Sequence, residues 1–105
     1  MIKPVPCRNF KDASIVEWIA KLVEETHEVV QEAEILEDLA DEDGTVDSDQ
    51  LGLVDVKERM AIELTDVITV CTSWLDALGY DEEARDTLQK RVNEKNRKRG
   101  YHNEA

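Results

Sequence analysis

The sequence has few of the residues that interrupt regular structure or form covalent scaffolds: four glycines, two prolines and two cysteines among 105 residues. So few breakers favour long helices over many short strands and turns. Cys7 and Cys71 are too few for a disulfide framework, and the two histidines do not complete a zinc site. No apolar run approaches the roughly 20 residues that span a bilayer, and no signal-peptide segment is evident. We therefore expect a cytoplasmic protein that does not bind membranes.

Basic side chains are also scarce, since 13 Lys and Arg stand against 25 Asp and Glu, giving a net charge of -12. Residues 24–49 contain twelve acids and no Lys or Arg, whereas residues 85–100 contain seven basic side chains. Because affinity for a nucleic-acid backbone comes from Lys and Arg, nucleic acid is not an expected partner, and cations are. A chain of this length fits one domain and buries only about two-thirds of its unfolded surface, which favours a homo-oligomer.

Apolar residues recur at helical spacing, which predicts an all-α fold. The predicted helices cover about residues 14–40, 54–78 and 84–98 of a single domain 1–105, with an acidic connector at about 41–53. Ser14 and Glu17 form a capping-box pattern at the start of the first helix. Residues 60–75 are apolar on almost every face, so this part of the second helix should be the most buried.

Glu63 and Asp66 are the only charged residues within positions 60–75. A buried carboxylate is costly unless it is paired, hydrogen-bonded or bound to a metal. Their i, i+3 spacing places both on one side of a helix, and Glu25 and Glu28 repeat that spacing in the first helix. If the two helices pack antiparallel, four carboxylates converge, and oxygen ligands alone suit Mg²⁺ or Mn²⁺.

Each acidic pair also has a structural explanation. Glu25 and Glu28 could be solvated surface charges, because acidic helix faces are common. Glu63 and Asp66 could form salt bridges with basic residues of the third helix. The occurrence of both pairs at the same spacing on two helices favours a shared cation site over two independent explanations.

Lys90, Asn93 and Arg97 share one face of the third predicted helix. They could bind phosphate groups, or the basic side chains could simply complement the negative C-terminal end of the helix dipole. Lys21 lies one turn before Glu25, so it could contact a phosphate or offset the repulsion between the acids.

The acidic segments resemble two motifs of the MazG-like all-α nucleoside triphosphate pyrophosphohydrolases. Residues 21–28, KLVEETHE, resemble the EExxE motif, and residues 63–66, ELTD, resemble the ExxD motif. The basic segment 90–100 resembles the asparagine-containing segment that follows in many members. The resemblance covers roughly residues 14–101 and implies a helical bundle that assembles into a dimer or tetramer.

The resemblance implies Mg²⁺-dependent hydrolysis of a (deoxy)nucleoside triphosphate between the α- and β-phosphates, for example to cleanse the nucleotide pool. Carried over by position, the metal ligands would be Glu25, Glu28, Glu63 and Asp66, with Mn²⁺ as a possible substitute. Glu24 would orient a ligand or assist the attacking water, and Lys21, Lys90, Asn93 and Arg97 would bind substrate. The 34 residues between the two acidic motifs are more than is usual in the family, which leaves the role of the connector open.

Two other functions remain open from the sequence. Phosphoribosyl-ATP pyrophosphohydrolase belongs to the same fold group and breaks the same type of bond, so only its substrate would distinguish it. A non-catalytic acidic helical module, which binds a partner through solvent-facing carboxylates, predicts neither Mg²⁺ binding nor turnover.

Overall fold

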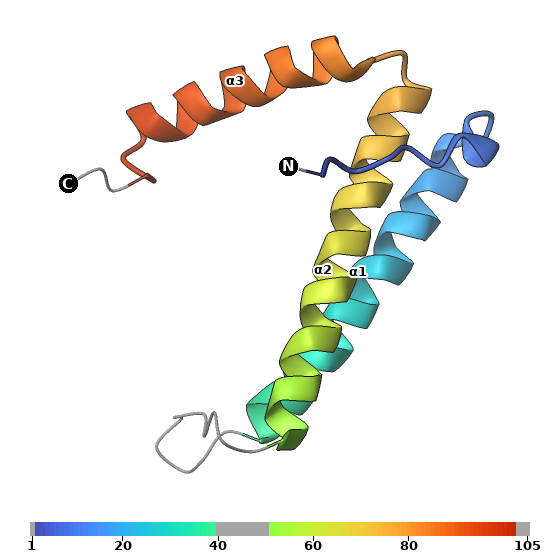
Figure 1. Cartoon of the computed structure of the whole chain (residues 1–105). Helices are drawn as coiled ribbons and strands as arrows, with labels where there is room; N and C mark the ends of the chain where they lie inside the picture. Colours follow the sequence, from blue (N-terminus) through green and yellow to red (C-terminus); the bar gives the residue numbers. More distant parts are fainter. Residues whose placement is uncertain (1, 40–50, 103–105) are drawn as a thin grey trace.

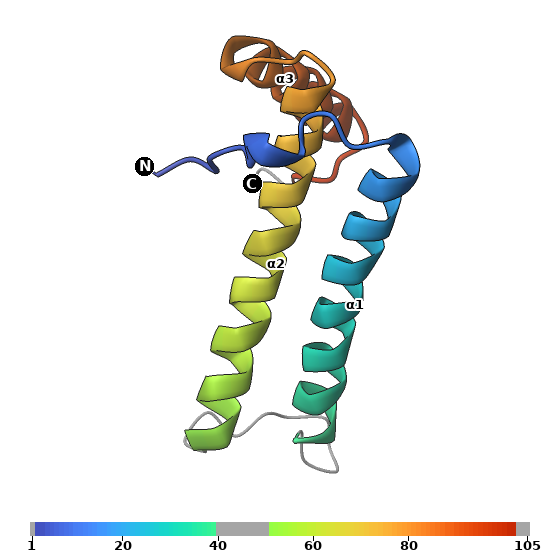
Figure 2. The same ribbon diagram turned by 90° about the vertical axis from the view of Figure 1, so that its right-hand side faces the viewer.

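The computed structural model describes residues 2–39 and 51–102, with only the backbone described for 51–54. In this part of the chain the elements are the 3₁₀ turn η1 (Arg8–Phe10) and the helices α1 (Ile15–Asp38), α2 (Leu51–Ala77) and α3 (Glu82–Lys98), with no strand. Helices α1 and α2 lie side by side and antiparallel, and α3 leads away from the end of α2 (Figures 1 and 2). The predicted all-α fold is confirmed.

The start of α1 follows the predicted capping box. The Ser14 hydroxyl accepts a hydrogen bond of 3.2 Å from the Glu17 backbone N–H, and the Glu17 carboxylate accepts one of 3.1 Å from the Ser14 N–H. These bonds satisfy two backbone donors that a helix start leaves unpaired, and they lower the pKa of Glu17. The capping box therefore fixes the residue at which α1 begins.

Helix α2 begins at Leu51, three positions before the predicted start near residue 54. Residues 51–53 of the predicted connector therefore belong to the helix, and its remainder lies outside the described residues. The helix includes Gly52, and a single glycine costs only about 1 kcal/mol relative to alanine in a helix, which good helix formers nearby can offset.

The corner between α2 and α3 is built from backbone and side-chain hydrogen bonds. Gly79 adopts a φ of 97°, and the N–H groups of Gly79 and Tyr80 donate to the carbonyls of Asp76 and Leu75, both at 3.0 Å. This pattern ends α2 and requires the left-handed conformation that glycine adopts without strain. The Asp81 side chain then accepts from the Ala84 N–H at 2.9 Å and caps α3.

Ionic contacts hold the same corner against the N-terminal segment. Asp76 pairs with Arg8 at 3.2 Å and with Arg85 at 3.4 Å, and Arg85 also donates to the Tyr80 carbonyl at 2.7 Å. The Cys7 N–H donates to the Ser73 hydroxyl at 2.9 Å. These contacts fix η1 on α2 and set the direction in which α3 leaves.

The apolar core of the single chain is small. Only Trp18, Val56 and Val70 are fully buried among the described hydrophobic residues, and the Trp18 ring stacks on Trp74 with centroids 5.9 Å apart. The burial of Trp18 identifies it as a core residue. The Cα radius of gyration is 17.2 Å, whereas a compact domain of this length has one of about 13 Å.

The middle of α2 is not the buried element that its composition predicts. Within one chain, Ile62 and Ile68 are each 53% exposed, and Leu64 is 46% exposed. The neighbouring α1 also exposes apolar residues: Ile15, Val16, Ile19, Val23, Val30 and Ile35. An apolar helix is buried only where another surface covers it, and the described residues cover α2 mainly on the side that faces α1 and, near its end, at η1. None of the described helices combines the length and apolar character needed to cross a membrane.

Candidate metal centre

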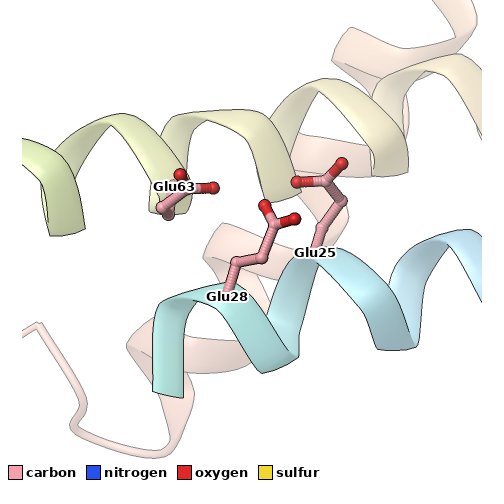
Figure 3. A group of neighbouring side chains, drawn as sticks. All are labelled: Glu25, Glu28 and Glu63. Atoms are coloured by element: carbon pink, nitrogen blue, oxygen red, sulfur yellow. The ribbon is translucent and has the colours of Figure 1, made fainter. Parts of the chain in front are cut away.

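Three carboxylates meet where α1 and α2 face each other. Glu25 and Glu28 come from α1 and Glu63 from α2, and each contributes one oxygen to a group in which all atoms lie within 4.8 Å of one another (Figure 3). Glu25 and Glu28 share a face because they are three residues apart, and the antiparallel packing brings Glu63 opposite them. The predicted convergence of acids from two helices is therefore present for these three residues.

Two oxygens of this cluster are buried without a hydrogen-bond partner. Glu25 is only 9% exposed, and its Oε2 atom and the Oε2 atom of Glu63 are both inaccessible and unpartnered. A buried acceptor in this condition carries a desolvation cost that a proton, a water molecule or a cation would relieve. The donor set consists of hard carboxylate oxygens, so it fits Mg²⁺ or Mn²⁺.

The crowding of negative charge changes the protonation of Glu28. Its pKa is raised to about 7, chiefly by a hydrogen bond with Glu63 and further by the charge of Glu25 and by burial. Carboxylates this close cannot all ionise easily at neutral pH. A proton therefore neutralises part of the cluster charge when no metal is bound.

Lys21 provides the cation that is paired with the cluster. Its Nζ lies 3.1 Å from Oε1 of Glu25, and its side chain is 43% exposed. The hydrogen bond to Glu25 is the main reason that the pKa of Lys21 is raised, and the charges of Glu24, Glu25 and Glu28 add to it. The predicted contact of Lys21 with substrate phosphate stays a prediction.

Asp66 and Glu24, the other acids predicted for the site, do not join the group of three. Asp66 follows Glu63 by less than one turn, but its side chain is exposed, and Glu24 is also exposed. Helical spacing gives the side of the helix on which Asp66 lies, but not its rotamer. Among the described residues, neither Glu63 nor Asp66 forms a salt bridge with α3, so the alternative explanation for this pair is not realised there.

The predicted phosphate-binding residues do share one hollow on α3. The hollow has a volume of about 520 Å³ and is lined by Lys90, Asn93, Glu94, Arg97 and His102. Arg97 is paired with Glu94 at 2.6 Å, and Nε2 of His102 lies 3.2 Å from the Asn93 carbonyl oxygen.

Sequence reasoning did not select His102. The sequence signal is Gly100, because a glycine after the last turn commonly ends a helix; it adopts a φ of 76° here, and the chain turns after it. The residues that line this hollow lie on α3 and just after it, and α3 leads away from the α1–α2 pair that carries the carboxylates (Figure 1).

No protein-family model matches the chain, and neither a curated protein nor a solved structure is significantly similar to it.

Proposed function

We propose that this protein is a Mg²⁺-dependent nucleoside triphosphate pyrophosphohydrolase with its metal centre between α1 and α2. The observation that carries the proposal is the pair of buried, unpartnered oxygens on Glu25 and Glu63, which lie beside Glu28 on two antiparallel helices. The resemblance of residues 21–28 and 63–66 to the EExxE and ExxD motifs supports the same reading.

The three clustered carboxylates would hold the cation, and Asp66 would become a fourth ligand by a change of rotamer. A divalent cation bound there supplies Lewis-acid chemistry: it neutralises the polyphosphate, polarises the phosphorus and lowers the pKa of a bound water. Glu24, exposed beside Glu25, would accept the proton of the attacking water or orient a ligand. The water oxygen bonds to phosphorus, the α–β anhydride bond breaks, and a monophosphate and pyrophosphate leave.

Lys90, Asn93 and Arg97 would bind the phosphate chain through the hollow on α3. Their position away from the carboxylates of the same chain favours a site that is completed by α3 of a second copy. The exposed apolar residues of α1 and α2 provide surface for such an assembly, because contiguous apolar patches mark association sites. We therefore propose a homo-oligomer, either a dimer or a tetramer, in the cytoplasm.

The inaccessible Oε2 atoms of Glu25 and Glu63 weigh against the non-catalytic acidic module, because that function requires carboxylates facing solvent. Phosphoribosyl-ATP hydrolysis uses the same bond chemistry and so remains the second candidate. No described residue selects between the two substrates.

The test is a pyrophosphate-release assay over canonical, deoxy- and damaged nucleoside triphosphates and phosphoribosyl-ATP, each with Mg²⁺ and with EDTA. The Glu63→Gln variant keeps the shape of the side chain and removes its charge. Glu58→Gln makes the same change at an exposed position of the same helix and serves as the matched control. We expect metal-dependent turnover of one substrate class, loss of turnover in Glu63→Gln and normal turnover in Glu58→Gln.

Turnover exclusively with phosphoribosyl-ATP would favour the second candidate. Absence of turnover over the whole panel, or full activity of Glu63→Gln, would refute the proposed function.

A further inference from the structure

Lys21 binds only one of the two oxygens of Glu25. Its Nζ contacts Oε1 at 3.1 Å, while Oε2 of the same carboxylate is buried and has no partner. The two oxygens of one buried side chain are therefore in different environments. One is held by a cation of the protein, and the other remains available.

The positions of these residues along α1 explain the difference. Lys21 lies one turn before Glu25, and Glu28 lies nearly one turn after it, so the two neighbours flank the carboxylate along the helix axis. One oxygen of Glu25 points toward Glu28 and Glu63, and the other points away from them (Figure 3). Because Lys21 precedes Glu25 by one turn and Glu28 follows it, the contact of Lys21 with Oε1 leaves Oε2 on the side of the other two acids.

We propose that Lys21 is a positioning residue of the metal centre: it holds Oε1 of Glu25 so that Oε2 is presented to the cation. This inference rests on the proposed function, because it needs the three carboxylates to bind a metal. It assigns Lys21 to orientation of a ligand instead of direct contact with substrate phosphate. Hydrogen-bond partners of this kind orient metal ligands in many proteins.

The sign of the effect on metal binding separates this role from a purely electrostatic one. A lysine beside the cluster repels a divalent cation, so removing only its charge should tighten metal binding. Removing a partner that orients a ligand instead weakens metal binding, typically about 10- to 100-fold. The two explanations therefore predict opposite changes.

The experiment measures Mn²⁺ binding to the full chain without nucleotide, by the paramagnetic resonance signal of free Mn²⁺. Lys21→Met removes the ammonium group and keeps most of the apolar stem, and Lys21→Arg retains a donor. Arg59→Met is the control for loss of charge, because Arg59 also pairs with a glutamate of α1, Glu32, at 3.1 Å and its replacement removes the same charge.

We expect Lys21→Met to raise the Kd for Mn²⁺ about tenfold or more. Lys21→Arg should restore most of the affinity, and Arg59→Met should bind Mn²⁺ as tightly as the parent protein or more tightly. Circular dichroism and thermal unfolding in EDTA establish that each variant is folded. If Lys21→Met does not fold, Lys21→Gln, which keeps a polar group at this partly exposed position, takes its place with the same expectation.

Unchanged or tighter Mn²⁺ binding in Lys21→Met would overturn the inference and leave the metal centre in place. An equal loss in Arg59→Met would overturn it in favour of a general effect of removing a paired basic side chain from these helices. Normal Mn²⁺ binding with weaker binding of inorganic triphosphate would assign Lys21 to the substrate. Failure of the parent protein to bind Mn²⁺, or equal binding by Glu63→Gln, would refute the proposed function as well.

Discussion

Glu63→Gln should be more stable than the parent protein in EDTA and less stable than the parent in Mg²⁺. In EDTA, oxygens of Glu63 and Glu25 lie within 4.8 Å of each other. Two full charges at that distance repel by about 3 kcal/mol at an effective dielectric constant near 20. Partial exposure of Glu63 and the Lys21 ion pair reduce this repulsion. We therefore expect the variant to gain ~1 kcal/mol in EDTA.

In Mg²⁺ the parent protein should be more stable than Glu63→Gln. A ligand at 100 times its Kd stabilises the folded state by about 2.7 kcal/mol, and the variant loses most of this gain because one carboxylate ligand is missing. Thermal unfolding compares the variant with the parent in EDTA and in Mg²⁺. The differences are measurable, since ~1 kcal/mol corresponds to a shift of several degrees in Tm for a domain of this size.

Glu58→Gln, exposed on the same helix, should follow the parent protein under both conditions. Equal stabilisation of Glu63→Gln and the parent by Mg²⁺ would refute the assignment of Glu63 as a ligand. Lower stability of Glu63→Gln in EDTA would refute the argument from carboxylate repulsion.

Three further predictions concern protons and assembly. The pKa of Glu28 is raised from 4.5 to about 7. Between these pH values the folded metal-free protein therefore binds more protons than the unfolded chain. Its free energy of unfolding in EDTA, measured with urea, should fall as the pH rises from 4.5 through 7. Because Glu28 is partly protonated near pH 7, metal binding should release a fraction of a proton per chain. Calorimetry in buffers of different ionisation enthalpy detects this release. Ile68→Glu places a charge on a residue that is 53% exposed in the single chain, and sedimentation should show a smaller assembly; an unchanged one would exclude this face from the interface.

The parts of the fold that the sequence predicted well depend on local chemistry. The Ser14–Glu17 capping box and the left-handed Gly79 each act within a few residues, so both predicted helix ends are observed. The approach of Glu28 to Glu63 was also predictable, because antiparallel packing of two helices converts two local spacings into one cluster. Asp66 shows the limit, since the rotamer of an exposed carboxylate is not fixed by helical spacing.

The direction of α3 could not be predicted from its own sequence. It depends on the corner at Gly79 and on Asp76, which joins Arg8 and Arg85 from distant parts of the chain. The exposure of Ile62 and Ile68 was missed for a related reason: composition shows that a helix needs covering, but not which molecule covers it.

A second copy of the chain would account for two features of the single chain. Apolar residues of α1 and α2 are exposed, and the hollow on α3 lies on a helix that leads away from the helices that carry the carboxylates. A partner that packs on the apolar face and places its α3 over the cluster would supply both the missing contacts and the missing cations.

Subunit complementation tests that arrangement directly. Glu63→Gln disables the carboxylate cluster, and Lys90→Ala weakens the hollow on α3, so each homo-oligomer should lose activity. If α3 acts on the partner's cluster, a mixed dimer contains one site with both parts intact and one with neither. Random exchange makes about half of the dimers mixed, which should restore about a quarter of the parent activity. If α3 instead acts within its own chain, every site in the mixture carries one substitution, and mixing would restore nothing.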